Sequence, residues 1–153
     1  MPKYFDIFKD AVGFSILSWV KTNPVPFAHN SFLPDTEYCL YFRKRGAVWN
    51  NGLKPTEIYR RSYISKKETR LEDGGDDHPT IKPLKMVADK IQISSSKGGG
   101  VLDPFGGSGT TLIACEQLNR KCYMSEIEPR YCEVIIKRWE KLTGERALPL
   151  AVR

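Results

Sequence analysis

The chain has 153 residues and a formal net charge of +6, and a chain of this length fits one domain with a modest core. It contains no apolar run of about 18 residues, which a membrane span needs, and its charged N-terminus does not resemble a signal peptide. Four cysteines form no CxxC pair and only two histidines are present, so we expect no metal site. These features predict a cytoplasmic protein with reduced cysteines.

The N-terminal part of the chain predicts two strands. Residues 14–22 read FSILSWVKT, and the NPVP sequence that follows ends this strand because proline cannot donate to a sheet ladder. Residues 36–44 alternate apolar and polar side chains, as a second strand does. Residues 45–77 show no sustained period, so we expect loops with short elements there.

A basic stretch runs from Arg43 to Arg70, with nine Lys or Arg against two Glu, a balance of +7 in 28 residues. It also carries Trp49, Tyr59 and Tyr63, and such a mixture of cations and aromatic rings can follow a nucleic-acid backbone. A solvated loop with scattered cations explains the charge equally well. On the first interpretation the candidate DNA contacts are Arg43, Lys44, Arg45, Arg60, Arg61, Lys66 and Lys67.

The second half of the chain alternates between helical and strand patterns. A helix with one apolar face is expected to begin near Pro83, and another from Pro129 to a stop at Gly144. Between them we expect a short strand at 101–102, a helix at 110–118 and a strand that ends at Glu126. Strand, helix, strand, helix is the order of a parallel, doubly wound sheet, so the expected fold class is α/β.

The segment VLDPFGGSGTT, residues 101–111, is typical of a ligand-binding turn at the carboxyl end of such a strand. Asp103 ends the strand, and the glycines at 106, 107 and 109 let the backbone approach a ligand closely. Ser108 or Thr110 is expected to cap the helix that follows. Glu126 comes 23 positions after Asp103, where an acidic residue typically holds ribose hydroxyls.

The spacing of the glycines excludes the two commonest phosphate-binding loops. The third glycine of GxGxxG would fall at Leu112, and GxxxxGK[ST] is absent. A ligand with an adenosine but no pyrophosphate fits better, and S-adenosylmethionine is such a cofactor. An acidic residue directly before the turn can also meet a cationic amino-acid moiety.

Three segments then follow one another in an informative order: HPTIKP at 78–83, LDPFGGSGTT at 102–111 and SEIEPRY at 125–131. In this order they resemble the amino-methylating DNA methyltransferases of the permuted, β-type arrangement, which act on adenine N6 or cytosine N4. WVKTNPVP and FLPDTEYCLYFRK in the first half are also similar to segments of that family. The resemblance implies a Rossmann-like methyltransferase fold, double-stranded DNA as substrate, and a role in DNA methylation of the restriction-modification kind.

The resemblance also implies roles for particular residues of the proposed S-adenosylmethionine pocket. Glu126 takes the ribose, and Gly109 belongs to the close backbone approach. The methionine end of the cofactor is lined by Thr80, Lys82, Asp103, Phe105, Gly107, Ser108 and Thr110.

One part of the family pattern is missing. The family's catalytic DPPY motif accepts the hydrogen bonds of the base amine and stacks on the flipped base, but this sequence has no Pro-Pro pair. The family's order places that motif upstream of Phe14, and only 13 residues precede this point. A cytosine-C5 mechanism needs a Pro-Cys nucleophile, which is also absent. We therefore assign no catalytic residue.

The resemblance predicts a single, incomplete methyltransferase domain over residues 1–153, with late sheet strands at 1–44, a basic loop region at 45–77 and a cofactor-binding half at 78–144. Without the catalytic strands, the strand at 101–103 would keep an unpaired edge. Several explanations stay open: a complementing methyltransferase segment or a second copy of the chain pairs with this edge, the strands rearrange, or the chain is a fragment of a longer gene product or a non-catalytic DNA-binding remnant. We expect the chain alone to bind the cofactor but not to methylate DNA.

Overall fold

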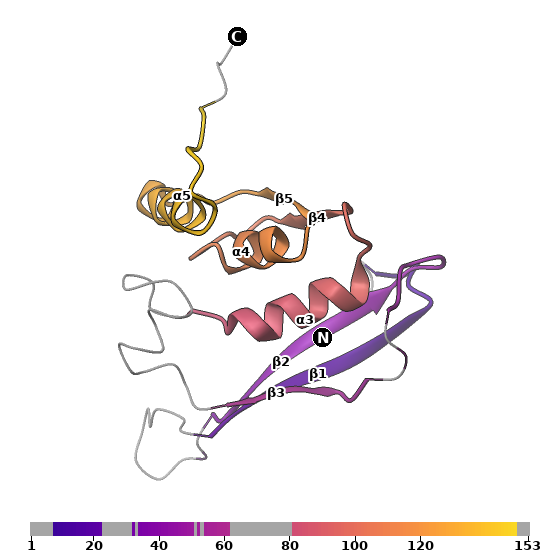
Figure 1. Cartoon of the computed structure of the whole chain (residues 1–153). Coiled ribbons are helices and arrows are strands. Elements are labelled where there is room, and N and C mark those ends of the chain that lie inside the picture. The colour runs from indigo at the N-terminus through magenta and orange to yellow at the C-terminus, as the bar shows by residue number, and fades with distance from the viewer. Residues whose placement is uncertain are drawn as a thin grey trace. The chain divides into compact units, whose positions relative to one another are not determined.

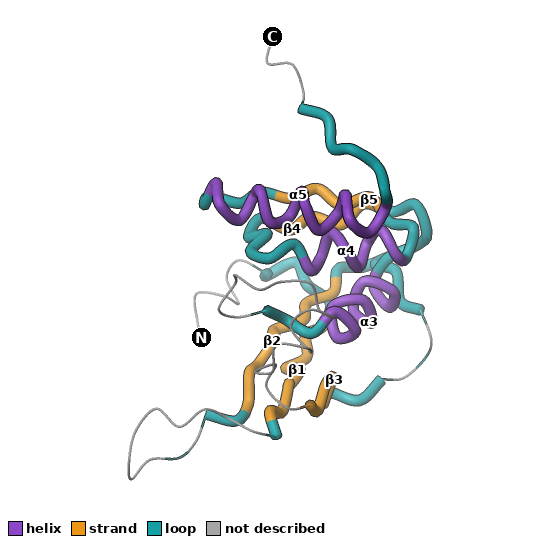
Figure 2. Tube along the Cα trace, turned by 60° about the vertical axis from the view of Figure 1, so that its left-hand side comes forward, coloured by secondary structure: helices purple, strands orange, loops and turns teal. Residues whose placement is uncertain are grey.

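The computed structural model describes residues 8–22, 32, 34–50, 52, 54–61 and 81–149, without the side chains of 57–59 and 61. The chain divides into two compact units, Met1–Tyr63 and Ile64–Arg153. Each described part has its own sheet (Figures 1 and 2). Within the described residues, no helix combines the length and the apolar composition that a membrane crossing requires.

The first unit contains a three-stranded sheet in the order β2-β1-β3. Strand β1 (Gly13–Lys21) pairs antiparallel with β2 (Thr36–Arg43), and both confirm the strands expected from the sequence. Strand β3 (Glu57–Arg61) pairs parallel with β1 across an irregularity at Ser18/Trp19, and is a short element inside the region without a period.

The second unit alternates helix and strand, which confirms the α/β class. The elements are α3 (Leu84–Ser94), β4 (Gly100–Asp103), α4 (Thr110–Gln117), β5 (Lys121–Met124) and α5 (Pro129–Thr143).

Strands β4 and β5 are parallel, so their carboxyl ends lie at the same edge, as Figure 1 shows. The core below them centres on Ile91, Ala114 and Cys115, with the aliphatic side chains of α3 packed around it. This packing fixes the start of α4 next to the ends of both strands.

Two local expectations were wrong. Neither Ser108 nor Thr110 caps α4, whose N-cap is Gly109 in the left-handed conformation with no side-chain cap. The two hydroxyls hydrogen-bond to each other instead, at 3.2 Å. Strand β5 ends at Met124 rather than Glu126. The Ser125 carbonyl oxygen accepts the Gly106 N–H of the loop after β4, and Glu126 lies in the loop beyond the sheet.

One side of the β4-β5 sheet remains open in the described part of the chain. Strand β4 pairs only with β5 there, so its other edge has no ladder partner among these residues. Leu102 and Tyr123 face the same way across the two strands and are 75% and 60% exposed. An unpaired edge beside exposed apolar side chains is a surface that favours further strand pairing.

The cysteines provide a test of this core. None of the four cysteines forms a disulfide, and Cys39 is exposed whereas Cys115 is buried. Burial raises the pKa of Cys115, and burial followed by the neighbouring Cys115 raises the pKa of Cys122 to about 12. We predict that iodoacetamide at pH 8 modifies Cys39 quickly, and Cys115 and Cys122 only on unfolding, because the thiolate is the reactive form.

The pH dependence of stability follows from the same shifts. Thiols of the unfolded chain ionise near pH 9, whereas Cys122 stays protonated in the native state up to about 12. The contribution of the buried Cys122 thiol to the free energy of unfolding is therefore complete below pH 9 and is lost as the pH rises toward 12. Peptide mapping that finds Cys115 and Cys122 modified in the native protein as fast as Cys39 would contradict this core.

Candidate functional site

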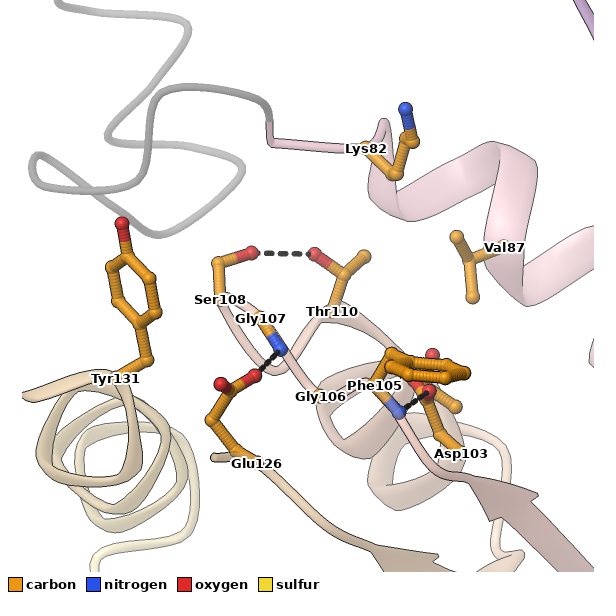
Figure 3. Close-up of a pocket in the computed structure, with 11 residues that line it drawn as sticks. Lys82, Val87, Asp103, Phe105, Gly106, Gly107, Ser108, Thr110, Glu126 and Tyr131 are labelled. Atoms are coloured by element: carbon orange, nitrogen blue, oxygen red, sulfur yellow. Dashed lines mark hydrogen bonds between the residues drawn. The ribbon is translucent and has the colours of Figure 1, made fainter. Parts of the chain in front are cut away.

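A pocket of about 360 Å³ lies in the second unit, at the carboxyl ends of β4 and β5 (Figure 3). The loop between β4 and α4 forms its floor, and residues of α3, the segment after β5 and α5 form its walls. Its lining consists of Lys82, Val87, Asp103, Phe105, Gly106, Gly107, Ser108, Thr110, Thr111, Glu126 and Tyr131.

Most of the residues expected at a cofactor site are thus gathered around one cavity. Lys82, Asp103, Phe105, Gly107, Ser108, Thr110 and Glu126 line it. Gly109 lies one residue behind the lining, at the start of α4. Thr80 falls outside the described residues.

Three lining residues were not expected, namely Val87, Thr111 and Tyr131, whereas Gly106 lines the pocket as its place in the glycine turn suggested. Val87 and Tyr131 come from the apolar faces of helices α3 and α5, where a sequence pattern suggests only core packing. The signal available in advance was that Tyr131 closes the SEIEPRY segment, five positions after Glu126.

The glycines of the loop meet close neighbours. A Cβ at Gly106 would lie 2.7 Å from Met124 Sδ, and one at Gly109 would lie 3.0 Å from Ile135 Cγ1. Gly109 also has φ +79°, which side chains rarely adopt. The loop therefore packs directly on β5 and α5, and only glycine fits at these two positions without rearrangement.

Two side chains of opposite charge hold two peptide groups of this loop. Glu126 Oε2 accepts the Gly107 N–H at 2.6 Å, and Arg138 donates to the Ser108 carbonyl oxygen. The second carboxylate oxygen, Glu126 Oε1, accepts the Glu128 N–H at 3.0 Å, just before α5. Bonds between charged and neutral groups are the stronger ones, so the loop is tied to the end of β5 and to α5 at once.

Asp103 and the two buried hydroxyls complete the polar part of the pocket. Asp103 Oδ1 accepts the Phe105 N–H at 3.0 Å, which turns the chain sharply after β4. Ser108 and Thr110 are 5% and 6% exposed and their hydroxyls bond to each other. Phe105 is 86% exposed, and its ring lies beside Asp103 (Figure 3).

The arrangement suits a particular kind of ligand. The two carboxylates, Asp103 and Glu126, lie on either side of Gly106 and Gly107, and Lys82 lies apart from both, before α3 (Figure 3). Such a pocket can take a molecule that carries hydroxyl donors, a cationic group and a carboxylate, with Phe105 and Val87 offering apolar contacts.

The residues expected to contact DNA belong to the first unit where they are described. Arg43, Lys44, Arg45 and Arg60 have exposed side chains. The Arg61 side chain, Lys66 and Lys67 lie outside the described residues.

Known proteins share both the sequence pattern and the fold. The N6/N4 DNA methylase family matches residues 3–138. The type II methyltransferase M2.DpnII of Streptococcus pneumoniae is 31% identical over 144 residues, which cover 84% of this chain and 52% of that protein. M2.MboI of Moraxella bovis is 30% identical over 141 residues, 84% of this chain and 50% of the relative.

Solved structures agree. The M1.HpyAVI–SAM complex superposes with a TM-score of 0.70 at 29% identity, over 91% of this chain and 68% of the other. TTHA0409 of Thermus thermophilus, complexed with S-adenosyl-L-methionine, superposes with a TM-score of 0.58 at 26% identity, over 100% of this chain and 66% of the other. The cytosine-N4-specific PvuII methyltransferase shares the fold at 20% identity with a TM-score of 0.69.

The fold is therefore that of the S-adenosylmethionine-dependent DNA methyltransferases. The chain belongs to the N6/N4 DNA methylase family and is homologous to type II methyltransferases of restriction-modification systems. It spans about half the length of the curated relatives it matches.

The glycine loop yields a prediction about stability. Gly109→Ala should lower the free energy of unfolding by more than Gly144→Ala does, because Gly144 has a similar φ of +74° but open space at its Cβ. The positive φ costs about 1–2 kcal/mol in both variants. Gly109→Ala adds the clash with Ile135.

Urea unfolding followed by circular dichroism measures both variants, with and without Ile135→Ala. The excess cost of Gly109→Ala should shrink when Ile135 is truncated, as expected for two residues in contact. Equal costs for the two glycines would show that the loop does not pack on α5 as described.

Proposed function

We propose that this chain binds S-adenosylmethionine and forms the cofactor-binding portion of a DNA methyltransferase that acts on adenine N6 or cytosine N4. The observation that carries the proposal is the pocket in which Asp103, the glycine loop and Glu126 meet. Family membership supports it, as do the two structural relatives solved with the same cofactor. Such a protein would act on double-stranded DNA in a bacterial cytoplasm.

The cofactor would supply a methyl group on a positively charged sulfur. We assign Glu126 to the ribose hydroxyls, since each carboxylate oxygen can accept a second hydrogen bond beside the one it already accepts from the backbone. Asp103 uses one oxygen on the Phe105 N–H and would meet the cationic amino group. Lys82, with Thr80, would meet the carboxylate of the methionine end.

The permuted arrangement is also part of the proposal. Residues 1–44 would supply late strands of the sheet, 45–77 a basic DNA-contacting region, and 78–144 the cofactor half. The absence of any Pro-Pro pair leaves the catalytic motif unassigned in this sequence. Direct transfer to a base amine would then need a segment that carries this motif, either from a complementing polypeptide or from the rest of a longer protein.

The exposed side of the β4-β5 sheet is where we place that segment. The open edge of β4 offers backbone donors and acceptors, and Leu102 and Tyr123 offer apolar surface beside it. A non-catalytic DNA-binding remnant is the competing function, favoured by the exposed cations of the first unit. Cofactor binding separates the two, since a remnant has no need of an intact pocket.

Calorimetry tests the cofactor. We predict binding of S-adenosylmethionine and S-adenosylhomocysteine, weakened in Glu126→Ala by about 1.5–3 kcal/mol, the contribution of a hydrogen bond to a charged group. Glu133→Ala, which removes an exposed carboxylate paired with Lys137 on α5, should bind as the wild type does. No heat with either ligand in a folded sample would refute the cofactor assignment.

The ribose contact needs a second comparison, because Glu126 also holds the Gly107 N–H. Removal of the 2′-hydroxyl from S-adenosylhomocysteine should weaken binding to the wild type and make little further difference in Glu126→Ala. An equal loss in both proteins would leave Glu126 as a support of the loop only.

Methyl transfer tests the missing motif. We predict that the purified chain transfers no tritiated methyl to mixed-sequence duplex DNA above background, because positioning and electrostatic stabilisation of the amine supply most of the rate. A polypeptide that carries the family's catalytic strands should restore transfer. Leu102→Glu should block this rescue without loss of cofactor binding, since Leu102 is exposed on the open sheet and does not line the pocket.

Robust transfer by the chain alone would show that another polar residue accepts the hydrogen bonds of the base amine. Rescue that is insensitive to Leu102→Glu would move the complementing segment to a different surface.

A further inference from the structure

Trp49 in the first unit is an exposed aromatic ring that several contacts hold in place. Its indole Nε1 donates to the Gly52 carbonyl oxygen at 2.6 Å. The Tyr41 ring meets it edge to face with the centroids 6.0 Å apart, and the Arg43 guanidinium lies 5.7 Å from its centroid. The ring is nevertheless 40% exposed.

Strand β2 supplies two of the contacts that hold the ring. Tyr41 and Arg43 are two positions apart on β2, so their side chains leave the same face of the sheet. Both contact Trp49. These contacts and the bond to Gly52 set the orientation of the indole, and part of the residue stays exposed.

The stretch of sequence around Trp49 carries cations and no acids. Residues 38–56 contain four Lys or Arg and no Asp or Glu. A turn closed by the Ala47 N–H to the Lys44 carbonyl, with Gly46 at φ +74°, carries Lys44 and Arg45 with exposed side chains. This turn leads the chain from the end of β2 back to Trp49, so the two cations lie within a few residues of the ring.

We propose that Trp49 is a stacking platform for an unstacked nucleobase of DNA, with Lys44 and Arg45 contacting the flanking phosphates. Every base has a π-face, and stacking on an aromatic side chain combined with cations along the backbone is how proteins bind unpaired strands. A ring already fixed by Gly52 and Arg43 loses little conformational freedom when the base arrives. The proposal shares with the proposed function only the idea that DNA is the partner.

A ring that serves only to cover β2 accounts for the contacts with Tyr41 and Arg43, but not for its 40% exposure or for the four cations without acids in the stretch 38–56. The two roles differ in one measurable respect. If the ring only covers β2, its removal lowers the free energy of unfolding. If it stacks on a base, its removal weakens binding to unpaired bases more than binding to paired ones, without a matching loss of stability.

Fluorescence anisotropy with three labelled probes of about 12 nucleotides, within the site sizes of single-strand binding folds, makes this comparison: a single strand, a perfect duplex, and a duplex with one unpaired base. Trp49→Ala should weaken binding to the single strand and to the unpaired base about tenfold, the lower part of the range for base stacking. Binding to the perfect duplex should change little, and the salt dependence should stay the same.

Two variants serve as controls. Arg45→Ala should lower the salt slope by about 0.7 for each single-strand phosphate contact that the substitution removes, and should weaken all probes. Tyr38→Ala removes another exposed aromatic ring, on the opposite face of β2, and should bind all probes as the wild type does. Thermal unfolding and binding of S-adenosylmethionine are measured for each variant.

Tryptophan fluorescence gives a readout that does not depend on truncating the ring. Single-stranded DNA should quench the wild-type signal, and Trp49→Phe should remove most of that quenching, since Trp19 is buried and Trp139 is half-buried on α5 with its Nε1 bonded to Glu116. Unchanged quenching in Trp49→Phe, or Trp49→Ala with wild-type affinity for all three probes, would overturn the proposal. Failure of cofactor binding with the probe discrimination intact would instead refute the proposed function and leave this site standing.

Discussion

The hydrogen bond from the Gly107 N–H to Glu126 Oε2 is the interaction on which the candidate site depends. It joins the loop after β4 to the loop after β5, so the two parallel strands present one continuous binding edge. Arg138 holds a second peptide group of the loop, two further along, through the Ser108 carbonyl oxygen. The Glu126 carboxylate accepts a hydrogen bond from an N–H of the loop, and the Arg138 guanidinium donates one to a C=O of the loop. The two hydrogen bonds together hold the loop in place against β5 and α5.

The sequence predicted the elements that local pattern determines. Pro129 and Gly144 mark the ends of α5 through backbone chemistry alone, and the alternation in β2 reflects its two faces. The loop and Glu126 were found because their spacing is itself the signal. The cap of α4 was wrong because Gly109 adopts the left-handed conformation at that position, and the hydroxyls of Ser108 and Thr110 satisfy each other.

Contacts between residues far apart along the chain could not be predicted from the sequence. Arg138 reaches Ser108 over 30 positions, and a single arginine on a polar helix face gives no sign of this. Trp49 was noted only as an aromatic residue in a basic stretch, because its return to β2 depends on a turn at Gly46 and a carbonyl at Gly52. The role of a side chain that acts through such tertiary contacts can be recognised only in the folded structure.

The open side of the β4-β5 sheet relates the fold to the question of activity. A two-stranded sheet with exposed Leu102 and Tyr123 can hold the pocket, because the pocket is built by the loops and by α3 and α5. Binding of a cofactor and transfer of its methyl group are therefore separable in this account. The most direct test of its central claim is a two-dimensional ¹H–¹⁵N NMR titration with S-adenosylmethionine. The account predicts shifts of the Gly106, Gly107 and Gly109 amides, with the amides of β1 and β2 unchanged. A saturating titration that leaves the loop amides in place would contradict it.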